Sequence, residues 1–379
     1  MIDLRTETHT PLSHEEKGVM LKHWIELDGE KYLFKTNYKY PDYKTYSNFG
    51  EVLYTNLSKK LKFPCVESYF ATTNYYEDNC NGVLVKSFFE SGDEDSMSYG
   101  EMIYMAKTRA NEFYYKSDYN NVESCIEVVK FVAKYLDRKV DLKQMRRDLI
   151  KMAIVDCFLG QSDRHQTNIE FIFDNNRNLR LAPTFDNGLC LSFGYEKWQV
   201  HEFLARDTYD KEVCARKGRP TSGGFMGNNN MFVISKPKMF RRNMDDNFIV
   251  DILQEATKDN EIRDLVENML TLDIYSYLDI LDMQNEVELP KDYKELASII
   301  YNNRRREFCK VAEDNKKKFS KLNLSTDLNK LKEKDLLASE QELRQKLAEV
   351  YQDVCKGYST KKKNNKFQDK KETDDGMLQ

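Results

Sequence analysis

The chain contains no long apolar run. Its hydrophobic segments are short and interrupted, and none approaches the roughly 18 residues that a membrane-spanning helix requires. The first residues, MIDLRTETHT, lack both the positively charged start and the apolar centre of a signal peptide. We therefore expect no membrane span and a cytoplasmic location, while secretion or translocation into another cell stays open.

Paired cysteines are also missing. The 8 cysteines are scattered without a C-x-x-C pair, which favours buried thiols in a reducing compartment over a disulfide framework. With 5 histidines and no paired Cys/His spacing, a structural zinc site is not expected. The net charge of -4 gives no general electrostatic reason to bind nucleic acid, so no direct nucleic-acid binding is expected either.

One stretch, residues 160–193, concentrates polar residues around two short apolar runs. The runs at 169–173 and 179–182 are typical of strands, and residues 174–178 between them are turn formers. The sequence therefore predicts a hairpin with polar groups gathered at one end. These polar residues are Asp163, Arg164, His165, Asn168 and Asp186.

The order and spacing of these residues favour phosphoryl transfer to a hydroxyl group. In that reaction one carboxylate accepts the proton of the attacking group, while an amide and a second carboxylate hold divalent ions at the phosphates. Asp163 and Asn168 have the D-x-x-x-x-N spacing of a kinase catalytic loop, and Asp186-Asn187-Gly188 stands where kinases have D-F-G. Each residue alone is a common turn residue, so the interpretation rests on the joint pattern.

The motifs S-D-R-H-Q-T-N and L-A-P-T-F-D-N-G resemble those of the HipA-like kinases, bacterial serine/threonine kinases that include stand-alone members of the CtkA type. The resemblance implies an α+β, two-lobed protein-kinase-like fold and autophosphorylation. It implies ATP and Mg²⁺ as cofactors, Asp163 as the catalytic base, and Asn168 and Asp186 as metal ligands in the ATP site. The best-known members are toxins neutralised by a protein partner, so an antitoxin-like regulator is a candidate partner. The protein substrate is unknown.

A second hairpin is predicted near the amino terminus. Strands at 23–27 and 32–34 flank an Asp-Gly turn, and Lys35 closes the second strand. The next helical pattern, residues 47–61, carries Glu51. In kinases a lysine at this place contacts the α- and β-phosphates and is positioned by a glutamate of the following helix. Lys35 and Glu51 are therefore a candidate ion pair in the ATP site.

A glycine-rich phosphate loop is absent before this hairpin. Protein kinases have G-x-G-x-x-G there, so that backbone amides can approach the phosphates. Residues 13–18 read SHEEKG and contain one glycine. The contacts of this loop with a nucleotide are therefore not predicted.

A strand at 82–89 would enter the hinge that binds adenine in the resembling fold. That alignment implies the Lys86 carbonyl and the Phe88 amide as adenine contacts in the ATP site. For His165 two roles stay open: a contact with the γ-phosphate, which Arg164 would share, or a structural hydrogen-bonding group.

One more strand is predicted at 65–72, before the strand at 82–89. After residue 93 the chain is predicted to be mainly helical. Helical spacing of apolar residues occurs at 122–136, 142–159, 239–258, 261–281 and 293–313. We expect a β-rich lobe over residues 1–90, a helical lobe over 91–313, and a charged tail, helical or disordered, over 314–379.

The residues after the Asp186 motif would form an activation segment, because kinases have one at this place. Residues 217–230 are rich in glycine and asparagine and are typical of a loop. Thr221 and Ser222 in this loop, and Ser13 upstream, are candidate phosphorylation sites.

Two other functions stay open. Phosphatidylinositol kinases share the D-R-H-x-x-N loop, and the mixed charges at 211–219 do not decide against a lipid acceptor. A nucleotide-binding interaction module of a toxin-antitoxin pair is the other alternative. The presence of the full set of Lys, Glu, Asp, Asn and Asp favours an active enzyme over such a module.

Overall fold

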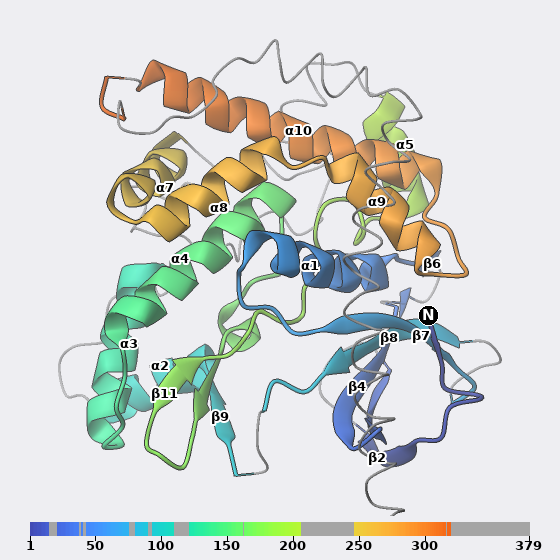
Figure 1. The fold of residues 1–379 in the computed structure, drawn as a ribbon, viewed down its shortest axis with the longest axis horizontal. Coiled ribbons are helices and arrows are strands. Elements are labelled where there is room, and N and C mark those ends of the chain that lie inside the picture. The colour runs from blue at the N-terminus through green and yellow to red at the C-terminus, as the bar shows by residue number, and fades with distance from the viewer. Residues whose placement is uncertain are drawn as a thin grey trace, which may run out of the picture.

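The computed structural model places a β-sheet beside a larger group of helices, with helix α1 (Ser47–Leu61) between them (Figure 1). The structure describes residues 1–14, 21–37, 39–40, 43–75, 80–89, 93–109, 121–161, 163–205, 246–315 and 317–319. The predicted α+β class is confirmed. Within these ranges, no helix combines the length and the apolar character that crossing a membrane requires.

The strands and helices follow one another in segregated blocks. The first block contains β1 (Ile2–Asp3), β2 (Thr10–His14), β3 (Lys22–Leu27), β4 (Glu30–Thr36), β5 (Lys39–Tyr40), β6 (Tyr43–Lys44), α1, β7 (Ser68–Thr73) and β8 (Cys80–Lys86). The second contains β9 (Asp95–Ser98), α2 (Tyr99–Arg109), α3 (Val122–Tyr135), α4 (Leu142–Leu159), a 3₁₀ turn (Gln166–Asn168), β10 (Glu170–Phe173), β11 (Leu179–Leu181), α5 (Lys197–Ala205), α7 (Asp246–Lys258), α8 (Asn260–Thr271), α9 (Ile274–Met283) and α10 (Lys291–Asp314).

The main sheet has the strand order β1-β7-β8-β4-β3-β2, and only the β1/β7 pair is parallel among these neighbours. The predicted hairpin corresponds to β3 and β4, and its turn residues Asp28 and Gly29 both have positive φ, 54° and 76°. Such angles suit a two-residue turn that matches the twist of the strands. One face of the sheet buries a small core that includes Ile25, Phe34 and Leu84. The opposite face of the sheet lines a cavity.

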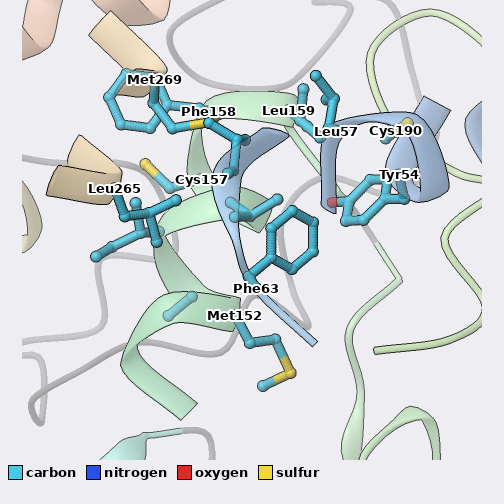
Figure 2. Packing of buried hydrophobic residues seen from close by; sticks show 14 of the residues in the cluster. Tyr54, Leu57, Phe63, Met152, Cys157, Phe158, Leu159, Cys190, Leu265 and Met269 are labelled. Atoms are coloured by element: carbon cyan, nitrogen blue, oxygen red, sulfur yellow. The ribbon is translucent and has the colours of Figure 1, made fainter. Parts of the chain in front are cut away.

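Helix α1 belongs to the core of the helical part rather than to the small sheet core. Leu57 of α1 packs in one cluster with Leu159 of α4 and Leu265 of α8 (Figure 2). On the same helix, the Asn56 Nδ2 donates a hydrogen bond of 3.0 Å to Gln284 Oε1, just after α9. Because burial of these side chains is favourable, α1 is anchored on the helices while it lies against the sheet.

Helix α4 delivers the chain to the polar stretch. Its start is capped by Asp141, whose side chain accepts from the Gln144 N–H, and its second half is buried from Ile150 to Leu159. It ends at Gly160, which has φ +60°, and a Cβ there would lie 3.2 Å from a guanidinium nitrogen of buried Arg304. A glycine fits both the left-handed backbone and the crowding.

Two expectations need correction. The helix predicted over 261–281 is two helices, α8 and α9, because Leu272 is extended and Asp273 caps α9 by accepting from the Ser276 N–H. The hairpin β10/β11 is confirmed, but β10 also pairs with β9, whose sequence DSMS gave no strand pattern. The loop at 217–230 with Thr221 and Ser222, and most of the tail after 314, lie outside the described residues.

Candidate active site

A cavity of about 890 Å³ lies between the inner face of the sheet, the start of α1 and the segments before β10 and after β11. This is a volume typical of small-molecule sites. Of the site residues predicted from the sequence, all but Arg164 line it: Lys35, Glu51, Lys86, Phe88, Asp163, His165, Asn168 and Asp186. Residues more than a hundred positions apart in the chain therefore share one space.

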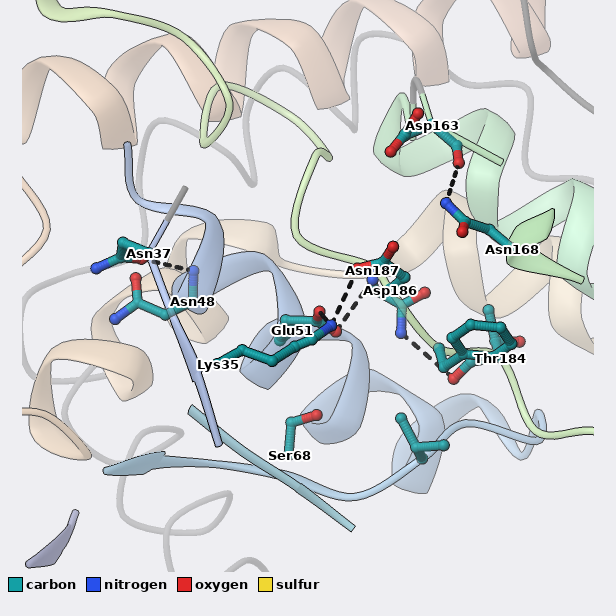
Figure 3. Close-up of polar contacts among 12 residues, drawn as sticks. Lys35, Asn37, Asn48, Glu51, Ser68, Asp163, Asn168, Thr184, Asp186 and Asn187 are labelled. Atoms are coloured by element: carbon teal, nitrogen blue, oxygen red, sulfur yellow. Dashed lines mark hydrogen bonds and ion pairs between the residues drawn. The ribbon is translucent and has the colours of Figure 1, made fainter. Parts of the chain in front are cut away.

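At the sheet side of the cavity, Lys35 lies between two carboxylates. Its Nζ is 2.7 Å from Glu51 Oε1 and 3.0 Å from Asp186 Oδ1, and the Lys35 and Glu51 side chains are only 7% and 4% exposed (Figure 3). Burial by itself would lower the pKa of Lys35, but Asp186 and Glu51 outweigh it and raise that pKa. The charge of Lys35 in turn holds the pKa of Asp186 below its usual value. Lys35 and Asp186 therefore both stay ionised near neutral pH.

Glu51 also holds the backbone that follows Asp186. Its second carboxylate oxygen accepts a hydrogen bond of 3.0 Å from the Asn187 N–H. Asp186 itself has φ 54°, in the left-handed region that non-glycine residues rarely adopt. Such backbone geometry persists where its surroundings fix it, and here Glu51 supplies part of that constraint.

Helix α1 and the Asp186 segment touch backbone to backbone. A Cβ added to Gly50 would lie 2.8 Å from the Gly188 carbonyl oxygen, and a Cβ on Gly188 would lie 2.9 Å from the Ser47 carbonyl oxygen. Both distances are too short for a real side chain, so the close approach depends on glycine at both positions. The position of α1 therefore sets the position of Asp186.

Arg164 does not reach the cavity, which corrects the expectation of a γ-phosphate contact. Its side chain is fully buried and its Nε lies 2.9 Å from Asp156 Oδ2. It also donates to Asn187 Oδ1 at 2.6 Å and to the Phe185 carbonyl, while the Tyr54 hydroxyl donates to Asp156 at 2.9 Å. Arg164 thus ties α1, α4 and the Asp186 segment together.

At the other side of the cavity, the Asp163 side chain is 25% exposed. Its backbone carbonyl accepts from Asn168 Nδ2 at 2.7 Å (Figure 3). Its carboxylate lies 3.6 Å from His165 Nε2, beyond hydrogen-bond reach. Burial is the main reason that the pKa of Asp163 is raised. A raised pKa makes a carboxylate a better proton acceptor.

The orientation of His165 follows from Thr167. The Thr167 N–H donates to His165 Nδ1 at 3.3 Å, so in the neutral ring the proton is on Nε2, the nitrogen nearer Asp163. His165 therefore caps the 3₁₀ turn that carries Asn168, and it lines the cavity as well. The structural role left open by the sequence is present, and it does not exclude a ligand contact.

Lys86 and Phe88 lie where the main sheet ends and the chain crosses toward α2. The Lys86 N–H donates to the Glu67 carbonyl at 2.8 Å, and its side chain pairs with Glu30 at 3.0 Å. The Phe88 ring packs on Phe185 with centroids 5.6 Å apart. Both residues border the apolar part of the cavity. The adenine contacts of the Lys86 carbonyl and the Phe88 amide stay a prediction.

The candidate ligands for a metal are side-chain oxygen atoms of Asn168 and Asp186. Asn168 Nδ2 is committed to the Asp163 carbonyl, which turns its Oδ1 the other way, and Asp186 is one-third exposed at its side chain. Among the described residues there is no cluster of three or more His, Cys, Asp and Glu side chains placed around a metal. Mg²⁺ suits the pair, since it prefers oxygen and usually takes few protein ligands beside phosphate and water.

Sequence reasoning missed the buried partners of this site. Asp156 occupies the apolar face of α4 and is fully buried. A charged residue on an apolar helical face is rarely buried unless it is paired. The position of Asp156 on that face was therefore the sequence signal for a buried partner. Lys22 and Trp24 of β3 also line the cavity, and no sequence pattern pointed to them.

The sheet, the helix α1 and the helical part form a kinase-like fold. Among solved structures, the Helicobacter pylori proinflammatory kinase CtkA has a TM-score of 0.61 at 18% sequence identity, covering 84% of this chain and 99% of that chain. HipA of Shewanella oneidensis MR-1, solved with HipB and operator DNA, has a TM-score of 0.43 at 11% identity, covering 82% of this chain and 74% of that chain.

The sequence itself defines the family. The family model of the HipA-like C-terminal domain matches residues 13–217, more than half of the 379 residues. The chain belongs to this family. No curated protein sequence matches it.

Proposed function

We propose that the protein is an ATP- and Mg²⁺-dependent phosphotransferase that acts as a serine/threonine protein kinase and can phosphorylate itself. The observation that carries the proposal is the convergence of Lys35, Glu51, Asp163, Asn168 and Asp186 on one cavity. The kinase-like fold and the family support the class of reaction. The substrate class and the cofactors belong to the proposal.

Each of these residues has a role that its surroundings allow. Lys35, held by Glu51, binds the phosphates, and the segment at Lys86 and Phe88 binds the adenine. Asn168 and Asp186 hold Mg²⁺, which when bound neutralises charge on the transferring phosphoryl group. Asp163 orients the acceptor hydroxyl and takes its proton as the hydroxyl oxygen bonds to the γ-phosphorus, while the bond from that phosphorus to the β–γ bridging oxygen breaks and ADP leaves.

The acceptor in this proposal is a serine or threonine hydroxyl of a protein. We place the reaction in the cytoplasm, since all six cysteines of the described residues are free thiols. The proposal retains residues 1–90 and 91–313 as the two lobes, with a separate tail at 314–379. An antitoxin-like protein is the proposed regulator, and isolation of the tagged chain from its own cells with bound proteins tests it.

Transfer of label from γ-labelled ATP tests the proposal directly. The full chain, Asp163→Ala and Asp186→Ala are incubated with ATP and Mg²⁺, first alone and then with a generic protein or phosphoinositide liposomes. Label on protein for the unchanged chain only is the expected result. Label on lipid would retain the fold-based class and replace the acceptor.

Nucleotide binding without transfer would favour the interaction module instead. The chain has 2 tryptophans, of which Trp24 lines the cavity and Trp198 is 55% exposed on α5. In a Trp198→Phe background, the fluorescence of Trp24 therefore reports ATP at this cavity. A change in fluorescence with no label transfer to any acceptor would contradict the proposal that the protein is a kinase.

A further inference from the structure

The face of the main sheet that lines the cavity, called here the roof, carries two rows of side chains that follow from the strand register. In β3, β4 and β8, Trp24 is opposite Leu33 and Leu33 is opposite Val85, which makes one apolar row. Lys22 is two residues before Trp24 in β3, Lys35 is two residues after Leu33 in β4, and the two lysines are opposite each other. Residues two apart on a strand face the same side, and these five residues all line the cavity.

The apolar row suits the adenine of a nucleotide, and the lysine row suits its phosphates. The apolar row is on the side of the segment at Lys86 and Phe88, where an adenine would lie. The lysine row is on the side of Glu51 and Asp186, where the phosphates would lie. Lys22 is therefore placed at the phosphate side of the roof.

Two lysines directly opposite on one face of a sheet repel each other. Lys35 has Glu51 and Asp186 within 3.0 Å, so that group of three already carries two negative charges against one positive charge. A polyphosphate that approaches this net-negative group needs further positive charge, part of which Mg²⁺ would bring. Lys22 is a second side-chain cation on the same face.

The sequence before β3 strengthens the need for a second cation. Residues 13–18 contain one glycine and two glutamates, so the sequence lacks the run of glycines that lets backbone amides approach phosphates.

We propose that Lys22 is a second phosphate ligand, whose ammonium group binds the polyphosphate of the nucleotide beside Lys35. This role rests on the proposed function, because it assumes that the cavity takes ATP. It gives the lysine row the task that backbone amides have in a glycine-rich loop.

Calorimetric titration of ATP and of adenosine, with Mg²⁺ present, tests the role of Lys22. The variants are Lys22→Met, Lys22→Arg and the matched control Lys31→Met. Lys31 is an exposed lysine of β4, opposite Glu26 and outside the cavity, so its substitution makes the same charge change in the same sheet. Thermal unfolding of each variant without ligand is measured alongside.

We expect Lys22→Met to bind ATP about tenfold more weakly, the fold-change of one lost charge-assisted contact, and to bind adenosine as before. Lys22→Arg recovers most of the ATP affinity, and Lys31→Met changes neither ligand. Unchanged ATP affinity in Lys22→Met would overturn the proposal. So would an equal loss for adenosine with a lowered melting temperature, since a structural role would produce it. If the unchanged chain binds neither ligand, the proposed function itself fails.

Discussion

The two sides of the cavity are built on different principles. On the sheet side, Lys35, Glu51 and Asp186 form a group of charges that satisfy one another. On the loop side, Asp163 keeps a quarter of its side chain exposed and has no ion pair within hydrogen-bond reach among the described residues. Paired charges hold a geometry, whereas a carboxylate that must take up a proton gains from weak pairing and a raised pKa. Under the proposed function, the sheet side of the cavity positions the nucleotide and the loop side reacts.

The largest expected effect on activity comes from removing the carboxylate of Asp163 alone. Asp163→Asn keeps the size of the side chain and removes the proton acceptor. We expect kcat for phosphoryl transfer to fall by roughly three to four orders of magnitude, because general-base catalysis is lost, while ATP affinity stays close to that of the unchanged chain. Steady-state kinetics with labelled ATP, together with a binding titration, measures both. A matched fall in ATP affinity would assign Asp163 to positioning.

Removing the buried support behind the positioning side should cost the most stability. Arg164→Met leaves Asp156 as a buried charge whose remaining bonds include that from Tyr54. We expect a loss of roughly 3 to 5 kcal/mol in the free energy of unfolding, measured by urea denaturation. Adding Asp156→Asn to the same chain should recover part of this loss. Two independent, additive losses would show that the pair is not coupled.

Breaking the charge group itself should have a smaller effect that depends on pH. Lys35→Met leaves two carboxylates without their cation, and we expect a loss of roughly 2 to 3 kcal/mol at pH 7, since Asp186 is partly exposed. The lowered pKa of Asp186 stabilises the fold above the usual value of 3.8, and this contribution is lost as the pH falls.

The difference in stability between Lys35→Met and the unchanged chain should therefore shrink as the pH falls through that range. Urea denaturation of both proteins between pH 3 and pH 7 follows this difference at about unit intervals. A constant difference would mean that Lys35 stabilises by packing rather than through the charge of Asp186.

The smallest expected effect has the opposite sign. The raised pKa of Asp163 means that its ionised form costs folding stability at neutral pH. Asp163→Asn should therefore increase the free energy of unfolding by about 1 kcal/mol or less at pH 7, although it lowers kcat. This gain is absent below the unfolded pKa of an aspartate, where the native side chain is protonated too. Thermal unfolding of the two proteins at pH 7 measures the gain, and a destabilised variant would refute it.

The sequence allowed the residues that line the cavity to be predicted more completely than their buried support. Asp163, Asn168 and Asp186 follow from local spacing, and Lys35 follows from a hairpin whose turn is marked by Asp28-Gly29. The direction of the Arg164 side chain does not follow from spacing, because it depends on a buried carboxylate from another element.

Lys22 was missed for a related reason. The β3 strand was predicted, but its cross-strand partners depend on the register of the folded sheet, and only that register places Lys22 opposite Lys35. In the same way, the break between α8 and α9 depends on one capping aspartate inside a continuous helical pattern.

The contact between Gly50 and Gly188 has a consequence for comparing sequences of this fold. At most interfaces a larger residue can be accommodated by a smaller partner, so many pairs of residues fit. Here each Cβ would meet a main-chain oxygen, and no partner can be made smaller to relieve it. A chain with a side chain at either position must hold the helix farther from the aspartate at the position of Asp186. These two positions are therefore a marker, readable from sequence alone, of how closely that helix and the aspartate can approach.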